Sequence, residues 1–211
     1  MNSYFAKEGY YLAEECSPTS AGNLEWVIDS FFGEKKKVFG GKIYGELDRL
    51  AESVSPDKSD VVFFPFLYGC NEDTLMKGGF LNLTASSSKA EIAAATFEGV
   101  VYSHKRHIDR LLSGRSTPEK IRLAGGAAKS DVWSQMFSDI TNLPVVTAAG
   151  NELGCLGAAI SAMVAEGRYK SLDEAVSASV RFTSIKEPRK DYSEIYCEKF
   201  EKYTDFIKKM R

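Results

Sequence analysis

The sequence lacks any long apolar run and any strong charge of one sign. No stretch approaches the roughly 20 consecutive apolar residues that a membrane-spanning helix needs, and the first residues do not have the basic-then-apolar pattern of a signal peptide. The net charge is −2 over 211 residues, which excludes a global basic field that would attract nucleic acid or an anionic membrane. We therefore expect a cytoplasmic protein that binds any anion through local geometry.

Cysteine and histidine are scarce and scattered. The four cysteines are Cys16, Cys70, Cys155 and Cys197. Their spacing fits neither a disulfide framework nor a metal site, so we interpret them as reduced thiols. His104 and His107 are one turn apart on a predicted helix, and two such side chains can chelate a metal. No third ligand is evident nearby, so we favour core or half-buried histidines and expect no metal site.

Apolar spacing predicts helices and strands in alternation. Two aromatic-rich runs around Gly9 indicate a hairpin in residues 4–13. Ser88 with Glu91 forms a capping-box pattern that opens the longest predicted helix. We expect strands at residues 61–64, 121–124 and 144–147, and helices at 43–54, 88–112, around 133–140, 151–164, 171–180 and 192–209. This order predicts one α/β domain with a mixed sheet, over residues 1–211.

Three local interpretations go with this outline. Asn23 is a plausible N-cap for a short amphipathic helix. The lysine run at residues 35–37 is interpreted as a solvated loop, because short charge runs usually face water. Gly154, Gly157 and Ala158 lie on adjacent turns of a predicted helix, where small residues favour close packing against a neighbouring element.

The segment at residues 121–130 is the best candidate for a ligand site. A predicted strand ends at Gly125 and Gly126, and a helix begins within a few residues. Two glycines allow a sharp turn and let a ligand lie directly on the backbone. Ser130 can cap the helix or offer its hydroxyl to a ligand. Alone, the pattern is also typical of a purely structural turn, because it matches neither a P-loop nor a G-x-G-x-x-G motif.

Several segments together resemble the FGGY family of carbohydrate kinases. Residues 123–135 resemble its adenosine-binding motif, and residues 154–159 resemble its GxLGAA pattern. Four further stretches resemble family motifs in the family's order: residues 20–26, 63–69, 79–83 and 97–101. These segments span nearly the whole chain. Residues 17–26 and 68–71 are most similar to the L-xylulose kinase subgroup.

The resemblance implies an actin-like ATPase domain of the ribonuclease H-like type, with a mixed sheet flanked by helices and without its first strands. Family members transfer the γ-phosphate of MgATP to a sugar hydroxyl, so ATP or ADP with Mg²⁺ is the implied cofactor. The implied nucleotide-binding residues are Gly125, Gly126, Ala127, Ser130, Gly22 and Glu25. Many relatives have Gln where this chain has Glu25. In place of a frequent Glu-Arg pair, the chain has Cys70 and Asn71.

Two further expectations come from what the resemblance does not cover. The family's catalytic aspartate and phosphate-binding Gly-Thr loops have no match in this chain, so we assign it no catalytic residue and expect no sugar phosphorylation by the chain alone. An incomplete sheet would leave an exposed edge or apolar face, which predicts a homodimer or pairing with the missing, sugar-binding half. Neither a nucleic acid nor a membrane is expected as a partner.

The alternative is a non-catalytic truncated homologue that senses nucleotide or binds a partner. A reading frame that continues upstream of Met1 would favour the kinase part, and a true start at Met1 would favour the alternative.

Overall fold

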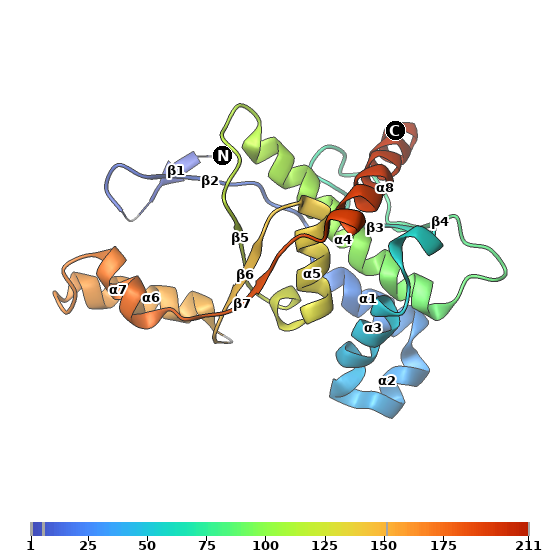
Figure 1. Cartoon of the computed structure of the whole chain (residues 1–211), viewed down its shortest axis with the longest axis horizontal. Coiled ribbons are helices and arrows are strands. Elements are labelled where there is room, and N and C mark those ends of the chain that lie inside the picture. The colour runs from blue at the N-terminus through green and yellow to red at the C-terminus, as the bar shows by residue number, and fades with distance from the viewer. Residues whose placement is uncertain (1, 6, 151, 211) are drawn as a thin grey trace.

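The computed structural model describes residues 2–5, 7–150 and 152–210 (Figure 1). The strands are β1 (Asn2–Tyr4), β2 (Tyr11–Ala13), β3 (Val62–Phe64), β4 (Gly79–Leu81), β5 (Ile121–Leu123), β6 (Val145–Ala148) and β7 (Phe182–Lys186). The α-helices are α1 (Gly22–Phe31), α2 (Gly33–Phe39), α3 (Ile43–Glu52), α4 (Lys89–Leu112), α5 (Asp131–Thr141), α6 (Leu153–Ala165), α7 (Leu172–Ser179) and α8 (Lys190–Lys209). Within the part of the chain that is described, no helix is long and apolar enough to cross a bilayer.

The predicted mixed sheet is confirmed in β5, β6 and β7. β5 and β6 are parallel, with Ile121 opposite Val145, whereas β6 and β7 are antiparallel, with Val145 opposite Lys186. β7 was not predicted. The predicted hairpin is confirmed in β1 and β2, and Gly9 has φ +79° at its turn, a conformation that glycine adopts without steric cost. β3 and β4 form a third, antiparallel pair.

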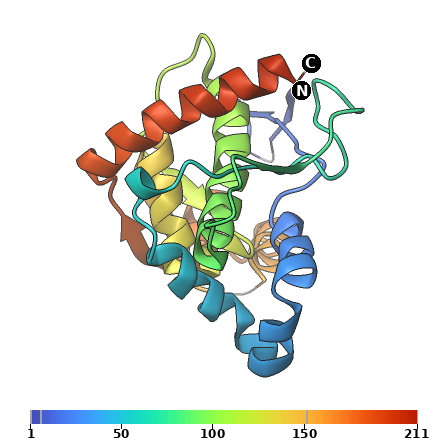
Figure 2. The ribbon, with the colours of Figure 1, turned by 90° about the vertical axis from the view of Figure 1, so that its right-hand side faces the viewer.

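Helix α4 forms the centre of the main body. Its N-terminus has the predicted capping box, in which the Glu91 amide donates to Ser88 Oγ and the Ser88 amide donates to the Glu91 carboxylate. Every residue from Ala93 to Ser103 is buried, because α1, α3, α5 and β3 all pack around this helix. Figure 2 shows α8 running across α4 and α5.

Among the glycines, the tightest surroundings are those of Gly99 on α4. A Cβ atom added there would lie 2.2 Å from the carbonyl oxygen of Phe63 on β3. No side chain fits at that distance, so glycine is required by packing. Phe63 itself is fully buried, which means that β3 cannot shift outward without exposing it.

Two buried carboxylates hold α8 against the body. Arg189, at its start, donates to Asp139 of α5, with 2.6 Å between Nη2 and Oδ2. Lys199 donates to Glu98 of α4 over 2.7 Å. Burial raises the pKa of Glu98, and the ammonium group of Lys199 opposes this shift. Removing one partner of a buried pair such as Lys199–Glu98 typically costs about 3–5 kcal/mol, and both pairs attach α8 to the body.

Two local interpretations are wrong. Asn23 does not cap α1: the helix begins at Gly22 after Ala21, and Asn23 is buried inside the first turn, donating to the Ser20 carbonyl. Residues 35–37 lie in α2 rather than in a loop. Each of these lysines has a carboxylate partner in the folded chain, at Glu46, Asp29 with Glu25, and Glu34 respectively, and these pairs compensate for the high charge density.

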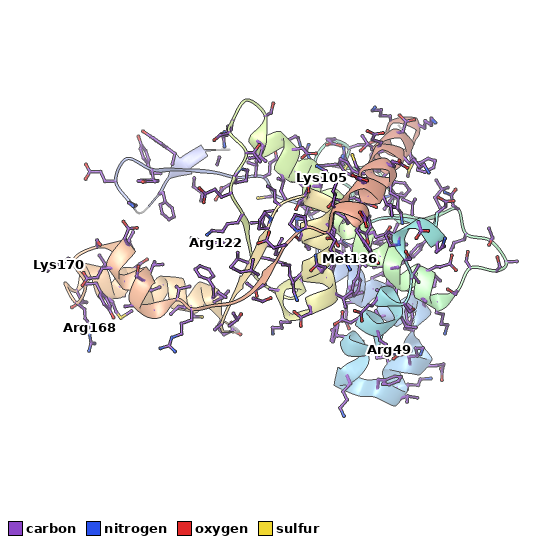
Figure 3. All side chains as sticks on the ribbon, viewed as in Figure 1. Arg49, Lys105, Arg122, Met136, Arg168 and Lys170 are labelled. Atoms are coloured by element: carbon purple, nitrogen blue, oxygen red, sulfur yellow. The ribbon has the colours of Figure 1, made fainter. Side chains whose placement is uncertain are left out.

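The β1–β2 hairpin and the α6–α7 unit extend from the same side of the body, on the left in Figure 1. Lys7 of the hairpin turn pairs with Asp173 of α7 over 2.7 Å. Arg168 and Lys170 lie at the far end of the α6–α7 unit (Figure 3). The prediction of close packing at Gly154 and Gly157 is wrong, because an added Cβ at either would meet nothing within 4 Å.

We predict that Gly99→Ala destabilises the fold by about 1–3 kcal/mol, because overpacking a rigid contact costs this much. The measurement is the urea midpoint of unfolding. Gly45→Ala is the matched control, since Gly45 lies in the exposed part of helix α3 with open space around it. This control should be neutral or stabilising by up to about 1 kcal/mol. Equal midpoints for the two variants would contradict the proposed contact.

Candidate functional site

A hollow of about 390 Å³ lies between α1, α3, α4 and the turn that follows β5. It is lined by Ala21, Leu24, Glu25, Tyr44, Asp48, Phe97, Gly126, Lys129, Ser130 and Trp133. The rings of Phe97 and Trp133 are stacked, with centroids 4.6 Å apart. Trp133 Nε1 also donates to the Phe97 carbonyl over 3.2 Å. The hollow therefore has a rigid, largely apolar base with polar groups at its rim.

The two glycines of the turn have different roles. Gly125 has φ +89°, a conformation that favours glycine. Gly126 has ordinary helical angles, φ −59° and ψ −43°. A Cβ added at Gly126 would meet only the Cβ of Ala21, at 3.7 Å. Gly125 thus makes the turn possible, whereas the missing side chain of Gly126 leaves space in the hollow.

Ser130 is fully engaged within the protein as a donor. It caps α5 as predicted, since its Oγ accepts from the Trp133 amide at 2.9 Å. Its hydroxyl proton goes to Asp48 Oδ1, 2.7 Å away on α3. A serine hydroxyl has one proton to donate. In this arrangement Ser130 orients Asp48 and has no proton left for a ligand.

Glu25 is the centre of a network at the rim of the hollow. Lys36 Nζ donates to its Oε1 over 2.8 Å, and the Tyr44 hydroxyl donates to its Oε2 over 2.6 Å. The hydrogen bond from Lys36, followed by that from Tyr44, lowers the pKa of Glu25. These contacts connect α1, α2 and α3, and they keep the Glu25 carboxylate ionised.

Asp48 is one of three polar residues of the hollow that sequence reasoning missed; the others are Tyr44 and Lys129. It is half-buried, and burial raises its pKa, an effect that the hydrogen bond from Ser130 opposes. Its second carboxylate oxygen has no hydrogen-bond partner among the described residues. Asp48 follows Leu47 in an amphipathic helix, and nothing in that pattern distinguishes it from an ordinary surface aspartate.

A second hollow of about 400 Å³ lies on the other side of the same turn, at the carboxyl ends of β5 and β6. It includes Gly125, Lys129, Ala148 and Gly154 in its lining. Ligands of α/β sheets favour this position at the strand ends. Lys129 borders both hollows, is exposed, and forms no ion pair within the described part of the chain.

The predicted site residues are distributed over both hollows. Gly126, Ser130 and Glu25 line the first, and Gly125 lines the second. Gly22 and Ala127 line neither, but each is next to a residue that lines the first. The carbonyl of Ala127 accepts from Ser134 Oγ over 3.3 Å, which anchors the turn on α5.

The two histidines make separate contacts. His107 Nδ1 lies 2.9 Å from Glu15 Oε2, and His104 Nε2 lies 2.7 Å from Ser20 Oγ. Burial lowers the pKa of His104. Across residues 2–5, 7–150 and 152–210, no group of three or more His, Cys, Asp or Glu side chains is arranged to hold a metal.

Residues 2–166 match the family model described as the FGGY family of carbohydrate kinases, C-terminal domain. The chain therefore belongs to the FGGY family of carbohydrate kinases. It is 32% identical to the L-xylulose/3-keto-L-gulonate kinase of Escherichia coli (strain K12), over 96% of this chain and 39% of that protein. It is 33% identical to the probable L-xylulose kinase of Pasteurella multocida (strain Pm70), over 94% of this chain and 38% of that protein. The chain thus spans about two fifths of these relatives' length.

Solved structures give the same fold. A ligand-bound xylulose kinase from Lactobacillus acidophilus matches with a TM-score of 0.84 at 23% identity, over 96% of this chain and 40% of that one. Plasmodium falciparum glycerol kinase with ADP matches with a TM-score of 0.70 at 21% identity, over 88% of this chain and 36% of that one. The predicted actin-like ATPase fold, with its mixed sheet and flanking helices, is confirmed.

Proposed function

We propose that this chain is the nucleotide-binding part of a cytoplasmic, ATP-dependent kinase that phosphorylates a ketopentose such as L-xylulose or D-xylulose. The observation that carries the proposal is the first hollow, which meets the Gly125–Gly126 turn in a chain of the FGGY family. L-xylulose kinases among the relatives support the substrate class. A structural neighbour with ADP supports the nucleotide.

In this proposal, adenosine occupies the first hollow and the phosphates extend toward Lys129. The apolar lining of Leu24, Phe97 and Trp133 suits a planar base, because binding sites for small molecules combine apolar walls with a few polar groups. Gly126 allows the nucleotide to approach the backbone. The ammonium of Lys129, which forms no ion pair with the described residues, complements the negative phosphates. Mg²⁺ would be held mainly by the phosphates and by residues outside this chain.

Gly126→Val tests the location of the nucleotide. The added side chain should occupy space in the hollow and weaken ADP binding at least tenfold, measured by calorimetric titration. The fold should tolerate the change, since only Ala21 lies within 4 Å of the new Cβ. Gly79→Val on β4 is the matched control, because it also has open space and lines neither hollow. Equal ADP affinity for Gly126→Val and wild type would remove the site assignment.

A second expectation concerns catalysis. Phosphoryl transfer depends on positioning, metal ions and charge stabilisation, and we propose that the groups supplying these lie outside residues 1–211. The chain alone should bind ADP yet give no ketopentose-dependent ADP release from ATP in a coupled assay. Turnover that depends on L-xylulose or D-xylulose, and that Gly126→Val abolishes, would refute this proposal.

A third expectation concerns partners. The hairpin exposes Tyr4, Tyr10 and Tyr11, and the small-residue side of α6 is open at Gly157. We propose that another polypeptide covers this region, and that the isolated chain forms a homodimer through it. Sedimentation should detect the dimer, and Gly157→Lys should weaken it. Gly45→Lys, in the exposed part of α3, is the matched control. A monomer at high concentration would refute self-association.

A further inference from the structure

We propose that Asp48 selects the nucleobase: its free carboxylate oxygen accepts a hydrogen bond from an amino group on the base, while Ser130 holds it in position. This inference rests on the proposed function, in which the first hollow takes a nucleotide. It assigns base selection to Asp48, a residue that neither the motif at residues 123–135 nor the other predicted site residues include.

The first step is to count the hydrogen-bonding groups that remain available in the hollow. Both oxygens of Glu25 already accept, from Lys36 and Tyr44. The Tyr44 proton is directed at Glu25, and the Ser130 proton at Asp48. These groups satisfy one another within the protein. Any ligand that relied on them would first have to break a hydrogen bond of 2.6 to 2.8 Å.

Two groups in the hollow's lining have no side-chain partner in the described chain: the second carboxylate oxygen of Asp48 and the ammonium of Lys129. One is an acceptor and the other is a cation. A nucleoside diphosphate has the complementary groups, since its phosphates are anionic and an amino-substituted base carries donors. A base with an oxo group at the same position would direct a lone pair at a carboxylate, which is unfavourable.

The position of Asp48 favours the base over the sugar. Its other oxygen is bound to Ser130, and Ser130 caps the helix whose Trp133 forms part of the apolar base of the hollow. The second carboxylate oxygen of Asp48 is therefore held beside the apolar part of the hollow, where a planar ring would be buried. Lys129 precedes Ser130 in the chain and borders the second hollow as well. The phosphates would therefore extend from the first hollow toward the second.

Partial burial adds to the selectivity. A half-buried acceptor that is left without its donor keeps the desolvation cost and gains nothing. Sites of this kind reject ligands that lack the matching group more strongly than apolar pockets reject a change in size. An oxo base should therefore bind much more weakly than an amino base of the same shape.

The experiment compares ADP with inosine diphosphate, which replaces the amino group of adenine by an oxo group, and with 2′-deoxy-ADP. Titrations use the full chain as wild type, Asp48→Asn and Asp131→Asn. Wild type should bind inosine diphosphate at least tenfold more weakly than ADP, a factor typical of one hydrogen bond to a charged group. Asp48→Asn should reduce this ratio to about threefold or less, because its amide can donate to an oxo group.

Asp131→Asn is the matched control. Asp131 is one residue from Ser130 and exposed, pairs with Lys186, and does not line the first hollow, so its substitution removes the same charge nearby and should leave the base ratio unchanged. Asp48→Asn should melt at or above the wild-type temperature at pH 7, because burial disfavours the ionised carboxylate. The wild-type ratio does not depend on the folding of any variant.

The outcomes separate the inference from the proposed function. Tight ADP binding with equal affinity for inosine diphosphate would overturn the role of Asp48 and leave the nucleotide site intact. A change in the 2′-deoxy-ADP ratio, but not in the base ratio, on Asp48→Asn would assign Asp48 to the ribose and also overturn it. Absence of ADP binding by wild type would instead contradict the proposed function.

Discussion

The close approach of α4 to β3 at Gly99 sets the position of the residues around the hollow. Because the Phe63 carbonyl occupies the space of a side chain at residue 99, the distance between α4 and β3 is fixed. Phe97, two residues earlier, accepts from the Trp133 indole, and this contact positions the first turn of α5. Ser130 caps that turn and binds Asp48. A backbone contact is thus transmitted, through single hydrogen bonds, to the polar rim of the candidate site.

Three consecutive residues of α4 connect three different parts of the molecule. Phe97 contacts α5, Glu98 holds α8 through Lys199, and Gly99 allows β3 to approach. Each requirement is strict for a different reason: aromatic stacking, compensation of a buried charge, and absence of a side chain. These requirements explain in physical terms why the segment at residues 97–101 resembles a family motif. The motif thus preserves the packing around the first hollow, and its Phe97 also lines that hollow.

Sequence reasoning succeeded where local chemistry determines structure. The capping at Ser88 and Ser130 depends on contacts within a single turn, and the stripe of buried residues in α5 follows from helical spacing. Sequence reasoning failed where contacts between distant segments determine the structure. Lys35 and Lys36 of the helix α2 pair with Glu46 and Asp29, which lie on other helices. Asp48 lines the candidate site beside Ser130, which donates to it and is 82 positions away in the sequence. No local pattern contains that information.

The first hollow lies within the packed body, whereas α6 extends away from that body. The first hollow is built from α1, α3, α4, α5 and the turn after β5, all within one packed body. The hairpin and α6 extend from this body on one side (Figure 1). The residues of the first hollow are therefore fixed by packing on α4, whereas the second hollow is lined by Gly154 of α6 together with Lys129. In the proposed function, a polypeptide that covers α6 would meet the phosphate end of the site and leave the base end unchanged.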